Sequence, residues 1–205
     1  MTQGESRTTI TGPVGALEVA LNQPAESPRG IALVAHPHPL HGGSLDNKVV
    51  QTLAKTFAAL GYVSVRLNFR GVGKSEGAFD DGVGETDDAL AVLAFAKTRF
   101  PGLAATRPVL AGFSFGSYVQ TRVAPLAPPE RMVFVGPAVN RFAGSAVPAD
   151  TIVIHGEQDD VVALADVLTW ARPQQLPIVV FPGCGHFFHG RLLQLQAVIT
   201  GMWKR

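Results

Sequence analysis

Ser114 lies in the pentapeptide G-F-S-F-G at residues 112–116, which has the pattern G-x-S-x-G. The pentapeptide follows an apolar run that begins at Pro108 and reads as a strand. A serine on a sharp turn after such a strand holds its hydroxyl above the sheet, and the glycines beside it leave room for a helix. Because 22 of the 205 residues are glycine, such a pentapeptide also arises by chance, so it predicts a nucleophile only together with partners elsewhere in the chain.

A serine hydroxyl is a poor nucleophile until a base takes its proton, and a histidine base needs a carboxylate to fix its tautomer. His186, in G-C-G-H-F at 183–187, follows an expected strand and is the candidate base. Asp159, in H-G-E-Q-D at 155–159, follows another and is the candidate acid. Asp160 competes with it, since either carboxylate could cap a helix that begins at Val161. We favour Asp159 as the acid and Asp160 as the cap.

The elements that must position these residues follow from the hydrophobic pattern. The first 25 residues alternate loosely around Gly12-Pro13 and predict an antiparallel hairpin at a sheet edge. From Ile31 on, short apolar runs alternate with longer amphipathic ones, which is typical of βα units and a parallel sheet. The expected strands are Ile31–His36, Val63–Leu67, Pro108–Phe113, Arg131–Val135, Thr151–His155 and Ile178–Phe181.

Helices are expected between these strands. One is capped by Ser44 and ends at Gly61, and another leaves the serine turn at Phe115. The others span about 86–99, 161–171 and 191–203. Ligands of an open α/β sheet bind beyond the carboxyl ends of its strands, so the loops that carry the serine, the acid and the base should meet there.

Composition limits the class of protein. A chain of 205 residues with 46% hydrophobic content can bury one sizeable core, so we expect residues 1–205 to form a single domain. The net charge of +1 and the lack of a Lys/Arg run argue against nucleic acid as a partner. The start of the chain is polar and no window approaches 18 apolar residues, so neither a secretory signal nor a membrane span is expected. One cysteine, Cys184, fits a reducing compartment, and the expected location is cytoplasmic.

Together, these motifs resemble those of compact bacterial α/β-hydrolases, close to the dienelactone-hydrolase-like proteins and small carboxylesterases. The order serine, acid, histidine is the chain order of that fold. The segment R-G-V-G-K-S at 70–75 also resembles a loop that follows the fourth strand in many of these proteins. True dienelactone hydrolases carry cysteine where this chain has Ser114, so the resemblance implies ester hydrolysis rather than a dienelactone substrate.

The resemblance also implies where an oxyanion would be bound. One donor is the backbone N–H of Phe115, the residue after the nucleophile. The other comes from the loop after the third strand, H-P-H-P-L-H-G-G at 36–43, in which the two prolines have no N–H to give. The position that matches the donor in the family is His38.

Two other functions remain open. His36, His38 and His41 imitate the H-x-H-x-D-H signature of zinc hydrolases of the metallo-β-lactamase fold, although Leu40 stands in place of the aspartate. Some α/β-hydrolase folds bind ligands without turnover, but such proteins often lose the triad that is present here.

The leading interpretation is therefore a serine hydrolase of small carboxylic esters that needs no metal, nucleotide or flavin. Its catalytic residues are Ser114, His186 and Asp159, and its only implied partner is a small-molecule ester. Only 15 residues lie between Val135 and Thr151, too few for a helical lid, so the site should be open and should favour short acyl chains. The oligomeric state and the natural acid and alcohol do not follow from the sequence.

Overall fold

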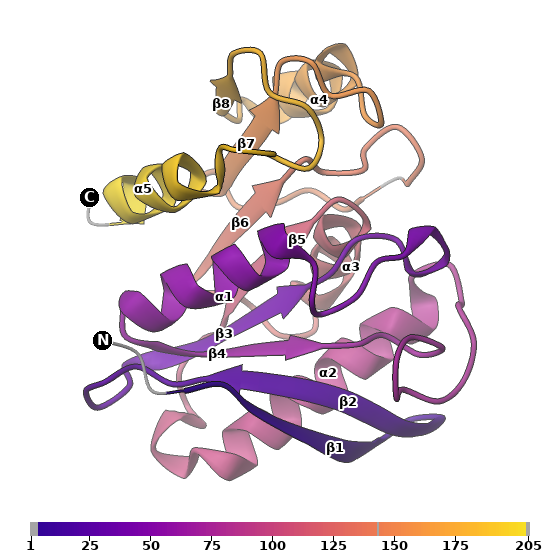
Figure 1. Cartoon of the computed structure of the whole chain (residues 1–205), viewed down its shortest axis with the longest axis vertical. Helices are drawn as coiled ribbons and strands as arrows, with labels where there is room; N and C mark the ends of the chain where they lie inside the picture. Colours follow the sequence, from indigo (N-terminus) through magenta and orange to yellow (C-terminus); the bar gives the residue numbers. More distant parts are fainter. Residues whose placement is uncertain (1–3, 143, 204–205) are drawn as a thin grey trace.

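A single eight-stranded sheet runs through the computed structural model, which describes residues 4–142 and 144–203 (Figure 1). The strand order is β1-β2-β4-β3-β5-β6-β7-β8. The hairpin β1–β2 is antiparallel and joins β4 antiparallel, whereas the remaining neighbours are all parallel. The strands are β1 (Ser6–Gly12), β2 (Gly15–Asn22), β3 (Gly30–Ala35), β4 (Tyr62–Leu67), β5 (Val109–Phe113), β6 (Arg131–Val135), β7 (Ile152–Gly156) and β8 (Ile178–Phe181).

In the described residues, four α-helices connect strands and a fifth follows β8, and the expected hairpin, parallel sheet and helix order are confirmed. The helices are α1 (Lys48–Ala59), α2 (Val83–Arg99), α3 (Phe115–Val123), α4 (Leu164–Ala171) and α5 (Leu192–Trp203). The expected cap of α1 is wrong, because the side chain of Asn47 accepts the N–H groups of Val49 and Val50. Ser44 instead accepts the N–H of Asp46 in the turn before the helix.

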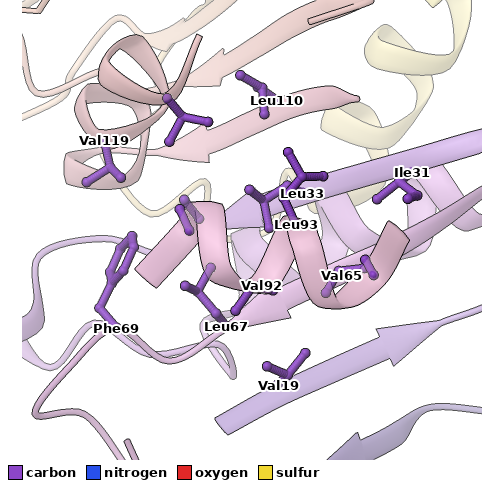
Figure 2. Close-up of a cluster of buried hydrophobic side chains, with 14 of the residues drawn as sticks. Val19, Ile31, Leu33, Val65, Leu67, Phe69, Val92, Leu93, Leu110 and Val119 are labelled. Carbon is purple, nitrogen blue, oxygen red and sulfur yellow. The ribbon is translucent and has the colours of Figure 1, made fainter. Parts of the chain in front are cut away.

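Helices cover both faces of the sheet and create two apolar layers. On one face, α2 and α3 pack against alternate residues of the central strands, as Figure 2 shows for Val92, Leu93 and Val119 around Leu33 and Leu110. On the other face, α1 and α5 pack against the intervening strand residues. Because the central strands are covered on both sides, they read in the sequence as continuous apolar runs.

A buried ion pair holds the long connection between β4 and α2. The guanidinium of Arg70 donates to both oxygens of Asp88, at 3.0 and 2.8 Å, and the Arg70 N–H donates to the same carboxylate at 2.9 Å. Asp88 is fully buried, so its carboxylate acts through this pairing with Arg70 rather than as an exposed charge at the start of a helix. The ion pair anchors the connection between β4 and α2, which contains Phe79, to the first turns of α2.

The segment between β6 and β7 is short and carries no lid. Within residues 136–151, apart from position 143, the structure contains only turns, bends and irregular chain. In the described part of the protein, no helix is both long enough and apolar enough to pass through a bilayer.

Candidate active site

The serine turn at the end of β5 has the strained backbone that the pentapeptide predicts. Ser114 adopts φ 54° and ψ −118°, outside the regions that L-residues favour, and α3 begins at the next residue. Its N–H donates to the carbonyl of Val135 at 3.0 Å. A side chain on Gly112 would overlap the backbone of Gly116, and one on Gly116 would overlap the carbonyl of Ala35. Both glycines are therefore required by close backbone packing.

The carboxylate of Asp159 is shared between a histidine and a turn. Its Oδ2 accepts the Nδ1–H of His186 at 2.7 Å, while its Oδ1 accepts the N–H groups of Val161 and Val162 at 3.0 and 2.8 Å. Burial alone would raise the pKa of Asp159, but the hydrogen bonds from His186 and Val162 outweigh it and hold the pKa below its usual value. The carboxylate is thus ionised and oriented at neutral pH.

The structure does not support Asp160 as a helix cap. Asp160 is exposed, and the N–H groups it was expected to cap are bonded to Asp159 instead. Because residues 159–162 form this turn, α4 begins only at Leu164, with Ala163 at its N-cap position. The competition between the two carboxylates is resolved by geometry in favour of Asp159 as the partner of His186.

His186 lies at the same corner of the sheet as Ser114. Its ring centroid is 4.9 Å from that of Phe113, and a Cβ on Gly136 would come within 3.2 Å of its Cε1. Gly136 directly follows Val135, the residue that accepts the Ser114 N–H. Within the described residues no hydrogen bond joins the Ser114 hydroxyl to His186. In sites without substrate, such catalytic hydrogen bonds are often long or poorly aligned.

The two backbone N–H groups expected to bind an oxyanion belong to His38 and Phe115. Phe115 is the first residue of α3, where helix N–H groups lack a partner within the helix. The Pro37 carbonyl accepts the Nδ1–H of His36 at 2.6 Å. Because carbonyl and N–H point in opposite directions in a trans peptide, the N–H of His38 points away from the His36 ring. The His38 and Phe115 rings are 5.1 Å apart, and in the described residues neither N–H makes a hydrogen bond.

The histidine cluster does not have the arrangement of a zinc site. Both ring nitrogens of the fully buried His36 are engaged, since Nε2 accepts the N–H of Phe69 at 3.1 Å while Nδ1 bonds to Pro37. Burial lowers the pKa of His36 to about 4, so the ring is neutral. Across residues 4–142 and 144–203, no group of three or more His, Cys, Asp or Glu side chains could hold a metal ion.

Aromatic rings surround His38 on the side of the serine turn. Its ring centroid lies 4.6 Å from His41, 4.7 Å from Phe79 and 6.0 Å from Phe142. Burial is the main reason why the pKa of His38 is lowered. The sequence did not predict these aromatic contacts, because Phe79 and Phe142 come from two long connections without a periodic pattern.

Two hollows lie near the loops that carry Ser114 and His186, although neither is lined by these two residues. One, with a volume of about 10 Å³, lies between α3 and the segment after β6, and its lining includes Tyr118, Ala138 and Phe142. The other, of about 190 Å³, lies between the start of α1 and the loop after β8. Its lining is Asn47, Lys48, Val49, Phe187, His189, Gly190 and Leu192.

Of the phenylalanines next to Ser114 and His186, only Phe187 is exposed. Phe113 and Phe115 are fully buried, and the ring of Phe113 supports His186 rather than facing solvent. Phe187 is 44% exposed, with its ring edge-on to His186 at 5.1 Å. Ser114 itself is only 6% exposed, so the mouth is narrower than the sequence implied.

This fold, with a serine on the turn after β5 and a hydrogen-bonded acid and histidine after β7 and β8, defines an α/β serine hydrolase. A family model described as serine aminopeptidase, S33, matches residues 35–149. That is more than half of the chain, and the protein belongs to this family.

Relatives of known sequence or structure agree with that assignment. An uncharacterized protein of Rickettsia prowazekii is 34% identical over 214 residues, which cover 93% of this chain and 85% of the relative. The structure of an alpha-beta serine hydrolase homologue from Coxiella burnetii is 39% identical with a TM-score of 0.86, and the match covers 95% of each chain. An α/β serine hydrolase without lid from Xanthomonas campestris is 37% identical with a TM-score of 0.92, covering 99% of this chain and 95% of that one.

Proposed function

We propose that this protein hydrolyses small carboxylic esters through a triad of Ser114, His186 and Asp159. The observation that carries the proposal is the 2.7 Å hydrogen bond from His186 Nδ1 to a buried, ionised Asp159, at the corner where Ser114 is held in its strained turn. An imidazole bonded through Nδ1–H has its Nε2 lone pair free to take a proton.

The reaction follows from these roles. Ser114 Oγ attacks the ester carbonyl carbon while His186 Nε2 takes its proton, and the oxyanion is held by the N–H groups of His38 and Phe115. The intermediate expels the alcohol, which takes the proton from His186, and an acyl ester remains on Ser114. His186 then deprotonates a water molecule, whose attack on the acyl ester releases the carboxylic acid and restores the serine.

The linings of the two hollows favour an ester over the free amino terminus of a peptide. An aminopeptidase must bind an ammonium group, which calls for a carboxylate beside the nucleophile. None of the described residues that line the two hollows is acidic, and the one beside His186 contains Lys48 and His189. The site therefore suits a substrate that is neutral or carries negative charge.

The surroundings of Ser114 favour a short acyl group. Ser114 is only 6% exposed, and the smaller hollow has a volume of about 10 Å³, which is room for about one water molecule. The described residues therefore leave little space for a long acyl chain beside the serine turn. In our proposal the leaving alcohol lies on the side of His186, which must return the proton to it.

The decisive test is labelling with a fluorophosphonate probe, followed by peptide mapping and by assays of Ser114→Ala. We expect the probe on Ser114 only, and a loss of turnover on the order of a million-fold in the variant. Ser145→Ala, which removes an exposed hydroxyl near the smaller hollow, is the control and should react and turn over normally. Labelling elsewhere, or activity on aminoacyl anilides that exceeds activity on p-nitrophenyl esters, would refute the proposal.

A further inference from the structure

A second histidine, His155, lies against the carboxylate of Asp159. It is the fourth residue of β7 (Ile152–Gly156) and is fully buried. Its Nε2 lies 2.9 Å from the carbonyl oxygen of Val162 and 3.5 Å from Asp159 Oδ2. Nothing in the proposed reaction uses this side chain.

The contacts of His155 define its tautomer. A carbonyl oxygen only accepts hydrogen bonds, so Nε2 must carry the hydrogen. Burial lowers the pKa of His155, so the ring is neutral and Nδ1 is an unprotonated acceptor. That Nδ1 is buried and has no hydrogen-bond partner among the described residues.

A buried acceptor without a partner destabilises the fold, and an apolar side chain of similar volume would avoid that penalty. The presence of an imidazole at this position must therefore be explained by the contacts of its other nitrogen, Nε2. Its Nε2–H donates to the carbonyl of Val162, and the N–H of the same residue donates to Asp159 Oδ1. His155 and Asp159 therefore both hold Val162 at the end of the turn 159–162.

We propose that His155 is a positioning residue that fixes the rotamer of Asp159, an inference that rests on Asp159 being the triad acid of the proposed function. With His155 in place, Asp159 Oδ1 accepts two backbone N–H groups, and Asp159 Oδ2 accepts the His186 N–H. The His155 Nε2–H, which carries partial positive charge, lies beside Oδ2. The carboxylate then has one orientation, in which Oδ2 faces His186.

The test compares two substitutions of His155 with opposite expected results. His155→Leu keeps the apolar volume and removes the donor. We expect kcat to fall about tenfold, the effect of one lost hydrogen bond near a charged group, with KM unchanged because no substrate contact is lost. In His155→Gln, the side-chain N–H can occupy the position of Nε2–H, so kcat should stay within about threefold of the wild type. Thermal unfolding of both variants separates this effect from loss of folded protein.

A wild-type kcat in the leucine variant would overturn the proposal, and so would an equal loss in both variants, which indicates packing alone. If the leucine variant does not fold, ¹⁵N NMR of the wild-type imidazole gives a second test. A neutral ring with the proton on Nε2 is expected, and a proton on Nδ1 or a charged ring would contradict the mechanism. Activity that survives Ser114→Ala would instead refute the proposed function, whatever the His155 variants do.

Discussion

Replacing Asp159 separates its two structural tasks, the orientation of His186 and the closure of the turn before α4. In Asp159→Asn, the amide oxygen can still accept the N–H groups of Val161 and Val162, which leaves the amide NH₂ facing His186 Nδ1. Two donors cannot share that contact, so the imidazole adopts the other tautomer and Nε2 can no longer act as a base.

The expected magnitudes differ between variants. Asp159→Asn should lower kcat about 10⁴-fold, equivalent to about 5.5 kcal/mol of barrier, while the free energy of unfolding changes by less than about 1 kcal/mol. Asp159→Ala should lose as much activity and also leave the buried Val162 N–H without an acceptor, which costs about 1–3 kcal/mol. Val161 is 40% exposed, so water can replace its lost partner.

The assay is hydrolysis of p-nitrophenyl acetate, with urea unfolding of each variant in parallel. Asp160→Ala is the matched control: Asp160 is exposed and the bonds to the turn come from its neighbour, so we expect stability within about 0.5 kcal/mol and normal turnover. An asparagine variant at position 159 with near-normal kcat, or a loss of several orders of magnitude at position 160, would refute this assignment of the acid.

Three further expectations follow from buried groups and from the size of the site. Unfolded chains protonate histidine near its ordinary pKa, whereas folded His36 does so only near about 4, so stability should fall by about 3 kcal/mol as the pH drops through that window. Urea titrations should show a smaller loss of stability over this pH range in His36→Asn than in the wild type, because other groups with lowered pKa values, such as His155, remain in the variant. Equal slopes would contradict the prediction. Asp88→Ala removes the close partner of the buried Arg70 guanidinium, which keeps only the exposed Asp80 at 3.9 Å among the described residues, and should destabilise the protein by about 3 kcal/mol by urea unfolding. Asp87→Ala, which changes the exposed neighbour, should have little effect. On a series of p-nitrophenyl esters, acetate or butyrate should be preferred without activation at a lipid–water interface, because the site offers little room to bury further methylenes, each worth about 0.8 kcal/mol. A preference for palmitoyl esters would indicate a deeper acyl channel.

The six strands from β3 to β8 were predictable to within one residue, for a physical reason. Strands covered on both faces produce uninterrupted apolar runs, and β6 has the bounds that the sequence predicts. The edge strand β8 is only partly buried, but its apolar run lies between Pro177 and Pro182, which set its bounds. The order of the acid and base also led us to expect Asp159 and His186 at one edge of the sheet, where they form a hydrogen bond.

The first residue of a helix was harder to predict than the bounds of a strand, because several side chains near each helix start can accept backbone N–H groups. Ser44 and Asn47 both qualify before α1, and the packing of the chain decides between them. The contacts of His155 could not be predicted for a related reason. His155 is the first residue of the motif H-G-E-Q-D, but the Val162 carbonyl that it contacts comes within reach only when residues 159–162 form their turn.

The left-handed backbone of Ser114 sets stability against function at a single position. Holding a serine at φ 54° and ψ −118° costs on the order of 1–3 kcal/mol, whereas glycine tolerates positive φ with little penalty. Mutagenesis screened for heat tolerance alone will therefore favour glycine at the nucleophile and select inactive proteins. The same trade-off is useful to the experimenter, since a glycine variant offers a stabilised, non-hydrolysing form in which an intact ester could be captured in the site.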